Sequence, residues 1–573
     1  MPKSEPAIEK TPAINGSFTD FLQSYYIDRL DFFPLEATSS GLEGYNDQLP
    51  NNLSYEYRND LKSFYTSNMK KLESFDKTSL TQEEKISHEI LQWECMIGFK
   101  KLSFRTDLLP INQFESLHLT MATLGSGQSM QPFKTVKDYN DWLKRLEKYA
   151  IWLDTAMARM IEGIEVGTVL PKSLVLKLIP QFKEMTRQDI GKHLFYSPMN
   201  QLPDNISSED SLSINTDYGL IIKDRLIPRF IAMAAFLEDE YLPAARKTSG
   251  IDSIVNGSNY YQAQIEEYTT TNMTSDKIHA LGLKEVERLR REMTKVMKTV
   301  NYTGSLTSFF NHVRKNKKLK PFTDPQQVID NFNSIHERMK PNLIKMFDLT
   351  PKTVFEVRRT EAFREATASA EYMPGSIDGT RPGIFYVPIP DIKEYNLYAD
   401  EDLFLHEAIP GHHYQISLQQ ENTSLPNFRK TLWYSAYGEG WALYCESLGK
   451  ELGLYTDPYQ YFGMLSAEMH RAIRLVVDTG IHSKGWNREK AIKYSLENEA
   501  ESEESIIAEI ERYMAWPGQA LSYKIGQLKI LELRDKCSKN KTFDIKKFHN
   551  YVLESGCVPL AVLENKLLSA DWK

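Results

Sequence analysis

The sequence predicts a mainly α-helical protein with one short β-rich segment, and three observations support this fold class. Apolar residues recur at helical rather than alternating spacing over long stretches of the chain. Glycine and proline are few for a chain of 573 residues, at 28 and 26, which argues against a turn-dense β architecture. Residues 350–400 are the region in which β-prone runs and turn formers replace the helical pattern.

Helices are expected from residue 18 to about residue 301 and again from about residue 399 to the C-terminus. The first 17 residues are polar and carry prolines, which is typical of a flexible tether, and they lack the apolar core of a signal peptide. The clearest helical patterns lie in residues 80–102, 136–167 and 275–300.

The β-rich segment contains two β-prone runs, TVFEVRR and GIFYVPIP, on either side of the turn-rich stretch EYMPGSIDGTRPG. Pro382 stands directly before the second run, and Pro388 stands near its end. Because proline cannot donate to a sheet ladder, we expect this run to be an edge strand rather than a central one. An edge strand has free backbone groups, which either hold an extended peptide or belong to an ordinary surface hairpin.

Charge and composition exclude several classes of function. The chain has 69 lysine and arginine residues against 77 aspartate and glutamate residues, a net charge of −8, which argues against nucleic acid as a partner. No run of about 20 apolar residues occurs, so no transmembrane segment is expected. The four cysteines show no CxxC spacing and are expected to be free thiols in the core. The N-terminus fits either a cytosolic start or an exported or lipid-anchored protein whose leader was removed.

The strongest sign of chemistry is the stretch LFLHEAIPGHHYQ, in which His406 and Glu407 follow an apolar run. In a zinc-binding HExxH helix the two histidines stand four residues apart, so that both imidazoles reach one ion. Here Pro410 occupies that position; on an unbroken helix His412 would point about 120° away, and His413 would lie about 10 Å further along. A two-residue bulge at the Pro-Gly step would bring His412 back. We therefore expect His406 and His412 as metal ligands, with His413 in reserve.

A third ligand is expected from the downstream stretch WYSAYGEGWALYCESLG. Glu439 lies there between two glycines that allow close backbone approach, and it would complete a His₂Glu site for one Zn²⁺ ion per chain. Glu446 follows on about the same helical face and is either the ligand itself or a partner that orients a ligand histidine. Glu407 is expected to act as the general base towards a zinc-activated water.

Stabilising the oxyanion requires a further donor, for which Tyr523 and His482 are the candidates, each with a purely structural role as its alternative. A substrate with a free C-terminal carboxylate would in addition need a positive charge to bind it. The candidates for that charge are Arg381, Arg471, Arg474 and Lys524. No feature of the sequence chooses among them.

The chain resembles a known bacterial family in six motifs along nearly its whole length. In chain order these are PLEATSSGLEGYNDQLPN, PGSIDGTRPGIFYVPIPD, HEAIPGHHYQ, GEGWALYCE, RLVVDTGIHSKGW and WPGQALSYKIG. They resemble the family catalogued as domain of unknown function 885, which is grouped with the HExxH-type metallopeptidases. Its architecture is similar to that of thimet oligopeptidase, neurolysin and angiotensin-converting enzyme. This chain departs from those enzymes in the Pro-Gly insertion between the histidines.

The resemblance implies a mainly helical, two-lobed catalytic unit over residues 18–573, with a deep cleft and a small sheet, at about residues 350–395, beside the metal-site helices of about residues 400–450. It implies that the GIFYVPIP strand, with Tyr386, lines the cleft and holds substrate backbone, and that Tyr523 helps to bind the tetrahedral intermediate. It also implies a cell-envelope location, since members often carry secretion or lipoprotein leaders.

The residues and the resemblance together predict a zinc-dependent hydrolase of peptide bonds in short peptides. Two alternatives stay open. One is a catalytically silent peptide-binding protein of the same fold, and the other is a metal-dependent amidohydrolase that acts on a non-peptide amide. The oligomeric state does not follow from the sequence.

Overall fold

The computed structural model describes residues 17–572 apart from 128, 363, 366–367 and 377–380. It confirms the predicted mainly helical fold with one small three-stranded sheet. The expected N-terminal tether lies outside the described residues, except for Ser17, which caps the first helix. None of the described helices is both long and apolar enough to cross a bilayer. All four cysteines are buried and free, as predicted.

The chain divides into two compact units. The first comprises residues up to 79, 91–260 and 514–516, and the second comprises residues 80–90, 261–513 and 517–573. The single two-lobed unit expected over residues 18–573 stays a prediction. Each compact unit buries its own set of apolar side chains.

The first unit consists of helices joined by short 3₁₀ and π segments. Its α-helices are α1 (Phe18–Phe32), α2 (Pro34–Ser39), α3 (Tyr55–Glu73), α5 (Leu117–Gly125), α6 (Val136–Glu165), α7 (Lys172–Glu184), α8 (Ser208–Leu220), α9 (Ile227–Phe236) and α10 (Leu242–Ala244). The 3₁₀ segments are η1 (Lys77–Ser79), η2 (Thr106–Leu108), η3 (Ile190–Lys192), η4 (Leu194–Gln201) and η7 (Ile251–Ser253), and the π segments are η5 (Ile221–Leu226) and η6 (Leu237–Tyr241). The helices α4 (Gln82–Lys101) and α11 (Gly257–Thr269) each belong partly to both units.

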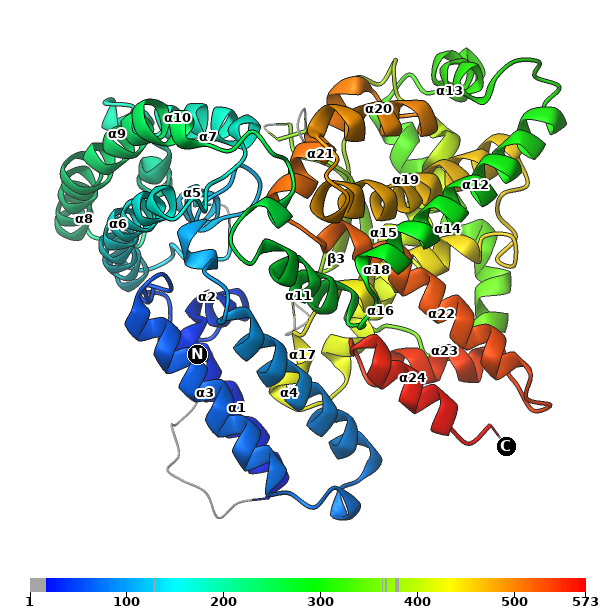
Figure 1. Cartoon of the computed structure of the whole chain (residues 1–573), viewed down its shortest axis with the longest axis horizontal. Helices are drawn as coiled ribbons and strands as arrows, with labels where there is room; N and C mark the ends of the chain where they lie inside the picture. The colour runs from blue at the N-terminus through cyan, green and yellow to red at the C-terminus, as the bar shows by residue number, and fades with distance from the viewer. Residues whose placement is uncertain (1–16, 128, 363, 366–367, 377–380, 573) are drawn as a thin grey trace. The chain divides into compact units, whose positions relative to one another are not determined.

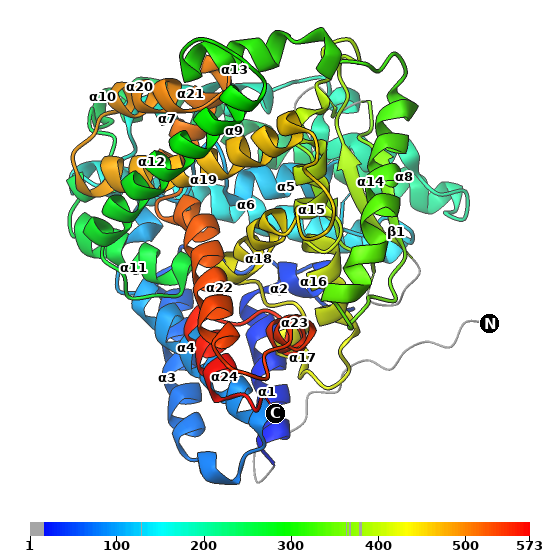
Figure 2. The ribbon, with the colours of Figure 1, turned by 90° about the vertical axis from the view of Figure 1, so that its right-hand side faces the viewer.

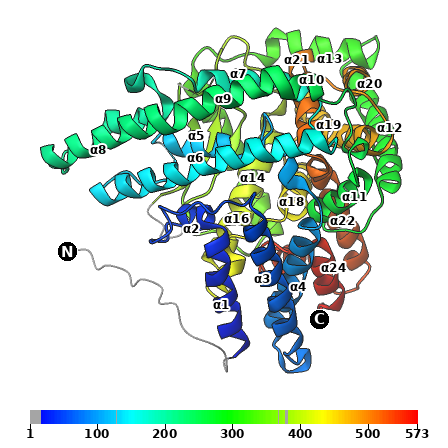
Figure 3. The same ribbon diagram turned by 60° about the vertical axis from the view of Figure 1, so that its left-hand side comes forward.

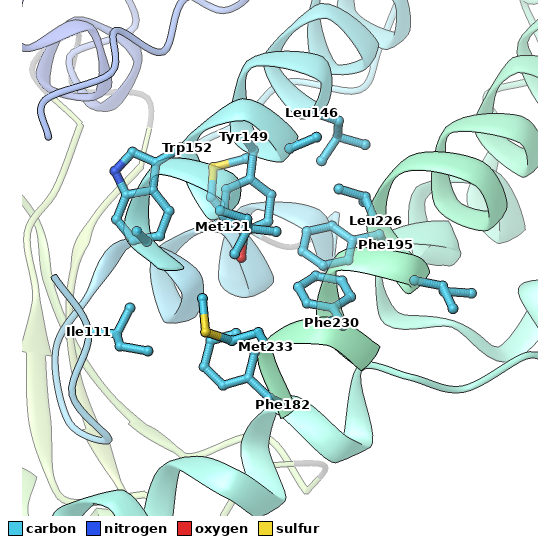
Figure 4. Packing of buried hydrophobic residues seen from close by; sticks show 14 of the residues in the cluster. Ile111, Met121, Leu146, Tyr149, Trp152, Phe182, Phe195, Leu226, Phe230 and Met233 are labelled. Atoms are coloured by element: carbon cyan, nitrogen blue, oxygen red, sulfur yellow. The ribbon is translucent and has the colours of Figure 1, made fainter. Parts of the chain in front are cut away.

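The helix α6 organises the core of the first unit. It begins with a capping box at Thr135, and the helix predicted over residues 136–167 is thereby confirmed almost to its end. Figure 3 shows α6 running beside α8 and α9. Its buried face contributes Tyr149 to an aromatic cluster in which Phe195 and Phe230 stack with ring centroids 6.0 Å apart (Figure 4). This cluster is apolar, while α6 also buries Arg145, which hydrogen-bonds Thr38 and Gln131.

The second unit carries the sheet and most of the remaining helices. Its α-helices are α12 (Ser275–Thr299), α13 (Leu306–Lys315), α14 (Pro325–Met346), α15 (Asp400–Glu407), α16 (His412–Glu421), α17 (Asn427–Lys430), α18 (Ser435–Ser447), α19 (Pro458–Ser483), α20 (Arg488–Asn498), α21 (Glu503–Ala515, whose last residues belong to the first unit), α22 (Ser522–Ser538), α23 (Ile545–Leu553) and α24 (Leu560–Ser569). Three 3₁₀ segments complete the unit: η8 (Lys317–Leu319), η9 (Leu397–Ala399) and η10 (Gln519–Leu521). Figure 1 shows α12 and α19 side by side.

The helices α18 and α22 approach each other closely and lie next to each other in Figures 1 and 2. Gly440 of α18 faces Gly526 of α22, and a Cβ atom at Gly526 would lie 1.8 Å from the carbonyl oxygen of Ala436. Only glycine permits this approach, because any side chain would meet backbone. The contact fixes the position of α18, which carries Glu439.

The sheet consists of β1 (Phe355–Arg359), β2 (Glu371–Met373) and β3 (Gly383–Val387) in the order β1-β3-β2. β3 pairs in parallel with β1 and antiparallel with β2, and all five of its residues are buried. The prediction that GIFYVPIP forms an edge strand is therefore wrong. Pro382 and Pro388 flank β3 from outside its ladder, so neither removes a hydrogen bond from it. The edges of the sheet are β1 and β2.

Candidate metal centre

The chain breaks completely between α15 and α16, where a two-residue bulge was expected. α15 ends at Glu407, and α16 begins at His412, after the Pro-Gly step. A Cβ atom at Gly411 would lie 2.0 Å from the carbonyl oxygen of His406, so only glycine fits there. The break starts a new helix at His412 in a new direction, which frees its imidazole from the helical spacing relative to His406.

The break brings His406 and His412 together with Glu439. The Nε2 atoms of His406 and His412 lie 3.6 and 3.5 Å from Oε2 of Glu439. The two imidazole rings stand nearly perpendicular, with centroids 4.8 Å apart. One ligand atom from each of the three residues lies within 4.8 Å of the others, and both histidines are buried while Glu439 is half-buried. We call these three residues the His₂Glu cluster.

The dimensions and donor types of the His₂Glu cluster suit a tetrahedral Zn²⁺ ion. Two ligands held about 2.0–2.1 Å from such an ion lie about 3.3 Å apart, close to the spacing of the two imidazoles from Glu439. Two imidazoles and one carboxylate also form a donor set that zinc accepts with a fourth position left open.

Glu446 supports the cluster from behind. Its Oε1 atom lies 2.6 Å from Nδ1 of His406, so it orients the imidazole with Nε2 towards Glu439. The second oxygen of Glu446 is buried and has no hydrogen-bond partner, and the same is true of Nδ1 of His412. Glu446 thus lies behind His406, and Glu439 lies where the two imidazoles converge; which of the two glutamates binds a metal stays a prediction.

The carboxylates around His406 favour a positive charge within the His₂Glu cluster. Burial lowers the pKa of His406, but hydrogen bonds to Glu439 and Glu446 raise it more, so its pKa lies well above the ordinary value. Burial raises the pKa of Glu439, yet the two histidines hold it below its usual range. Without a metal, a proton on His406 therefore compensates the carboxylates. A divalent cation that binds the cluster has to displace this proton.

Glu407 is buried beside the cluster without joining it. Burial raises the pKa of its carboxyl group, the charges of His406 and His412 lower it, and the charge of Glu439 raises it again, with a net upward shift. The backbone of Tyr372 in β2 also hydrogen-bonds this carboxylate. A carboxyl group with a raised pKa, held next to the ligands, is suited to accept and return a proton near neutral pH.

His413, the reserve ligand, points away from the cluster. Its Nδ1 atom lies 2.9 Å from the hydroxyl of Tyr372 and 3.4 Å from that of Ser417. Its ring packs on Phe355, and burial lowers its pKa to about 4. This histidine ties α16 to the sheet.

Several predicted residues have structural partners instead of facing the cluster. His482 is fully buried, and its Nε2 atom lies 2.9 Å from the carbonyl oxygen of Tyr513. Lys524 is fully buried and forms ion pairs with Glu468 at 2.5 Å and Glu285 at 3.2 Å. These contacts account for both side chains within the second unit.

The remaining candidates lie on the sheet segment and on α19 and α22. Arg381 is exposed, and its backbone N–H donates to Ser376. Tyr386 lies in the central strand with its ring under the guanidinium of Arg364, so the strand's backbone is not free to hold a peptide. Tyr523 is half-buried and contacts Arg474 and Arg471 through its ring.

Trp433 is a site neighbour that the sequence interpretation missed. Its ring centroid lies 5.7 Å from that of His412, and 43% of the residue is exposed. A Cβ atom at Gly438 would lie 2.1 Å from this indole. The glycine before Glu439 was therefore a signal: it makes room for a large side chain at the cluster. Tyr372 was missed because nothing in its own segment suggests contact with Glu407.

Two surface hollows of the second unit lie elsewhere. One is lined by the first turns of α4 and by α24, and the other by residues of α13, η9 and their neighbours. Neither includes a residue of the His₂Glu cluster.

Comparisons with known proteins agree on family and fold. Residues 34–567 match the family described as "Bacterial protein of unknown function (DUF885)". A "putative lipoprotein" from Colwellia psychrerythraea has 27% identity and a TM-score of 0.87, over 96% of this chain and 98% of that one. A "putative lipoprotein of unknown function" from Shewanella oneidensis has 19% identity and a TM-score of 0.76, over 97% and 100%, and shows the shared fold alone. No curated protein matches the chain.

Proposed function

Because this chain belongs to the bacterial DUF885 family, whose description assigns no activity, we propose from its own side chains that it is a zinc-dependent peptidase of short peptides. The observation that carries the proposal is the convergence of two buried imidazoles and one carboxylate beside a buried glutamate, Glu407. A cluster that only stabilised the fold would not need Glu407, a buried carboxylate in addition to that of Glu439.

His406, His412 and Glu439 would hold the ion, and Glu446 would fix the orientation of His406. A bound Zn²⁺ ion supplies Lewis acidity, which polarises a carbonyl group and makes a water molecule a better nucleophile at neutral pH. Glu407 accepts the proton of the attacking water and delivers it to the leaving amine nitrogen. Its raised pKa suits both halves of this transfer.

We also propose that the fold belongs with the HExxH-type metallopeptidases. In support, an HE pair lies at the end of a buried helix, a later helix supplies a glutamate, and a small sheet lies next to the HE pair through Tyr372. The Pro-Gly break replaces the four-residue spacing of the usual motif by a change of helix direction. The edge next to Glu407 is β2, and this strand takes the substrate-binding role first expected of the GIFYVPIP run.

A cell-envelope location is part of the proposal. It is supported by the descriptions of the two solved relatives as putative lipoproteins. Fractionation of the native bacterium followed by immunoblotting tests it: the protein is expected with the envelope, and recovery only in the cytosolic fraction contradicts it.

The activity is tested by digesting a library of short peptides with zinc-loaded and EDTA-treated protein, with mass-spectrometric detection of the products. We expect cleavage that disappears with EDTA and returns with about one Zn²⁺ per chain. Peptide binding without cleavage in either sample would support the silent binding protein instead. Cleavage of acyl amides but of no peptide would support the non-peptide amidohydrolase.

A further inference from the structure

Two arginines and one tyrosine form a group on α19 and α22, helices that pack against those of the His₂Glu cluster. Arg471 and Arg474 lie one turn apart on α19, and Tyr523 lies in the first turn of α22. The guanidinium carbons of Arg474 and Arg471 lie 4.6 and 5.9 Å from the ring centroid of Tyr523. Both cations thus lie within cation–π distance of the same aromatic ring.

Neither arginine uses its full hydrogen-bonding capacity. Arg474 is 6% exposed and donates to the hydroxyl of Tyr513 at 3.0 Å and to Glu509 at 2.8 Å, but its Nη1 atom is buried without a partner. Arg471 reaches only the carbonyl oxygen of Ala467, at 3.5 Å, and its Nε atom is also buried without a partner. Within the described part of the chain, Arg471 forms no ion pair.

The charges nearby do not balance. Glu509 is shared by Arg474, by Arg512 at 3.2 Å and by His470 at 3.6 Å. Burial lowers the pKa of His470, but the charge of Glu499 and hydrogen bonds to Glu499 and Glu509 together raise it more, so the net shift is upward and favours the imidazolium. These cations and Arg471 outnumber the carboxylates of Glu499 and Glu509; Asp402, which the charge of Arg471 also reaches, has a pKa that burial and Glu446 raise. An unpaired buried cation costs free energy unless an anion joins it.

The arginine pair lies on a helix that packs against the helices of the His₂Glu cluster. α19 packs against both α15 and α18, the helices that carry His406 and Glu439. Asp402 lies one turn before His406 on α15. Burial and the charge of Glu446 raise the pKa of Asp402, and the charge of Arg471 partly offsets this rise. On the other side, Ser522, next to Tyr523, lies 2.7 Å from Ser435 at the start of α18.

The other cations considered from the sequence do not have these properties. Lys524 is fully buried and already compensated by two glutamates. Arg381 is exposed and lies beside the sheet, where water solvates its charge.

We infer that Arg471, Arg474 and Tyr523 form a carboxylate-binding subsite, so that the substrates are short peptides with a free C-terminal carboxylate near the cleaved bond. The inference rests on the proposed function. Arginine N–H groups form charge-assisted hydrogen bonds to carboxylates. In this pair, Nη1 of Arg474 and Nε of Arg471 are buried donors without a partner. The Tyr523 hydroxyl, for which the described residues offer no hydrogen bond, is a third donor.

Two libraries of N-acetylated tripeptides, one with free C-terminal carboxylates and one with carboxamides, provide the test on the zinc-loaded full chain. We expect kcat/KM for the acids to exceed that for the amides by on the order of 100-fold. Arg471→Gln should lower kcat/KM for the acids by a similar factor, mainly through KM, and Arg471→Lys should restore part of it. The zinc content should stay unchanged, and Arg291→Gln, an exposed arginine on α12, serves as the matched control.

Equal turnover of acids and amides by the wild type overturns the subsite. If neither library is cleaved, the proposed function fails, and calorimetric binding of the same libraries then decides the subsite by itself. Acid-selective binding that Arg471→Gln abolishes supports it, whereas binding that does not distinguish acids from amides, or that survives Arg471→Gln, refutes it.

Discussion

The helix α6 and the segment α15–α16 are both buried, but for opposite physical reasons. α6 runs for 30 residues and buries one face made largely of aromatic and aliphatic side chains. α15 has 8 residues, and its buried set comprises Asp400, Glu401, Asp402, Phe404, Leu405, His406 and Glu407. Burying apolar area stabilises the fold, at about 25 cal/mol per Å², whereas burying an ionisable group costs free energy unless it is paired. The buried face of α6 is mostly apolar, although it includes Asp141 and Arg145, whereas the buried side chains of α15 are mostly ionisable and depend on their partners.

The buried polar side-chain atoms that have no hydrogen-bond partner also differ between these two regions. Within the apolar cluster around α6 they are neutral groups, such as the indole nitrogen of Trp142 and the hydroxyl of Tyr149. Near the His₂Glu cluster they include atoms of the ionisable residues His412 and Glu446, beside the amide oxygen of Gln415. Unsatisfied ionisable groups at a buried site indicate that a ligand completes it. The predictions below test this contrast, from the largest expected effect to the smallest.

Glu407→Gln should lower kcat by about 10³–10⁴-fold while leaving the zinc content unchanged, because the substitution removes the proton acceptor but no ligand. Peptide turnover and atomic absorption on the same sample check it. Glu489→Gln, on the exposed side of α20, is the matched control and should behave as wild type. A Glu407→Gln variant that retains more than a tenth of the activity would remove Glu407 from the proposed mechanism.

His412→Ala should release the zinc, whereas His413→Ala should retain it. The reason is that Nε2 of His412 lies 3.5 Å from Glu439, while Nδ1 of His413 lies 2.9 Å from the Tyr372 hydroxyl. Zinc affinities from competition with a chromogenic chelator distinguish the two variants. The opposite result would show that the break between α15 and α16 is placed differently from the structure described above.

Phe195→Ala should destabilise the first unit by about 3–5 kcal/mol and leave zinc affinity unchanged, because it empties the centre of an apolar cluster. Hydrogen–deuterium exchange of peptides from α6 and α9 reports the loss locally. Leu212→Ala is the matched control, since this leucine of α8 is 71% exposed and should cost little. A fall in zinc affinity for Phe195→Ala would contradict the expectation that the apolar cluster of the first unit does not affect zinc binding.

Glu446→Gln should weaken zinc binding by about 10–100-fold without abolishing it, as expected for a residue that orients a ligand. Complete loss of zinc would make Glu446 a ligand and exclude the present assignment of Glu439. The same chelator competition used for the histidine variants measures this smaller effect.

The sequence predicted the helical class and singled out the three side chains that converge in the His₂Glu cluster, because both depend on local patterns. Helical periodicity is visible along α6, and the HE pair with the Pro-Gly step shows that the chain must turn near His412. It did not predict the central position of β3. Proline restricts pairing only at its own residue, and Pro382 and Pro388 both lie outside the ladder.

The sequence also could not predict the roles of individual lysines and arginines. Arg471 and Lys524 are both basic residues on helices, and only tertiary contacts separate them: two glutamates compensate Lys524, while no carboxylate pairs with Arg471 in the described part of the chain. Pairings between helices far apart in the chain leave no periodic signal, so their partners could not be predicted.

The smallest expected effect is the pH dependence that His118, in the first unit, gives to the free energy of unfolding. Burial lowers the pKa of His118 to about 4 in the folded chain, against about 6.5 when unfolded. Between these values the unfolded state binds the extra proton, so the free energy of unfolding falls as the pH drops, by about 2 kcal/mol between pH 7 and pH 5 for this group. His118→Gln should remove that part of the pH dependence. Urea unfolding of metal-free protein at both pH values measures it, and identical pH dependence in variant and wild type would show that His118 is not held neutral by burial. The comparison matters because the same burial acts on His406, where two carboxylates reverse its effect and keep the proton that a metal has to displace.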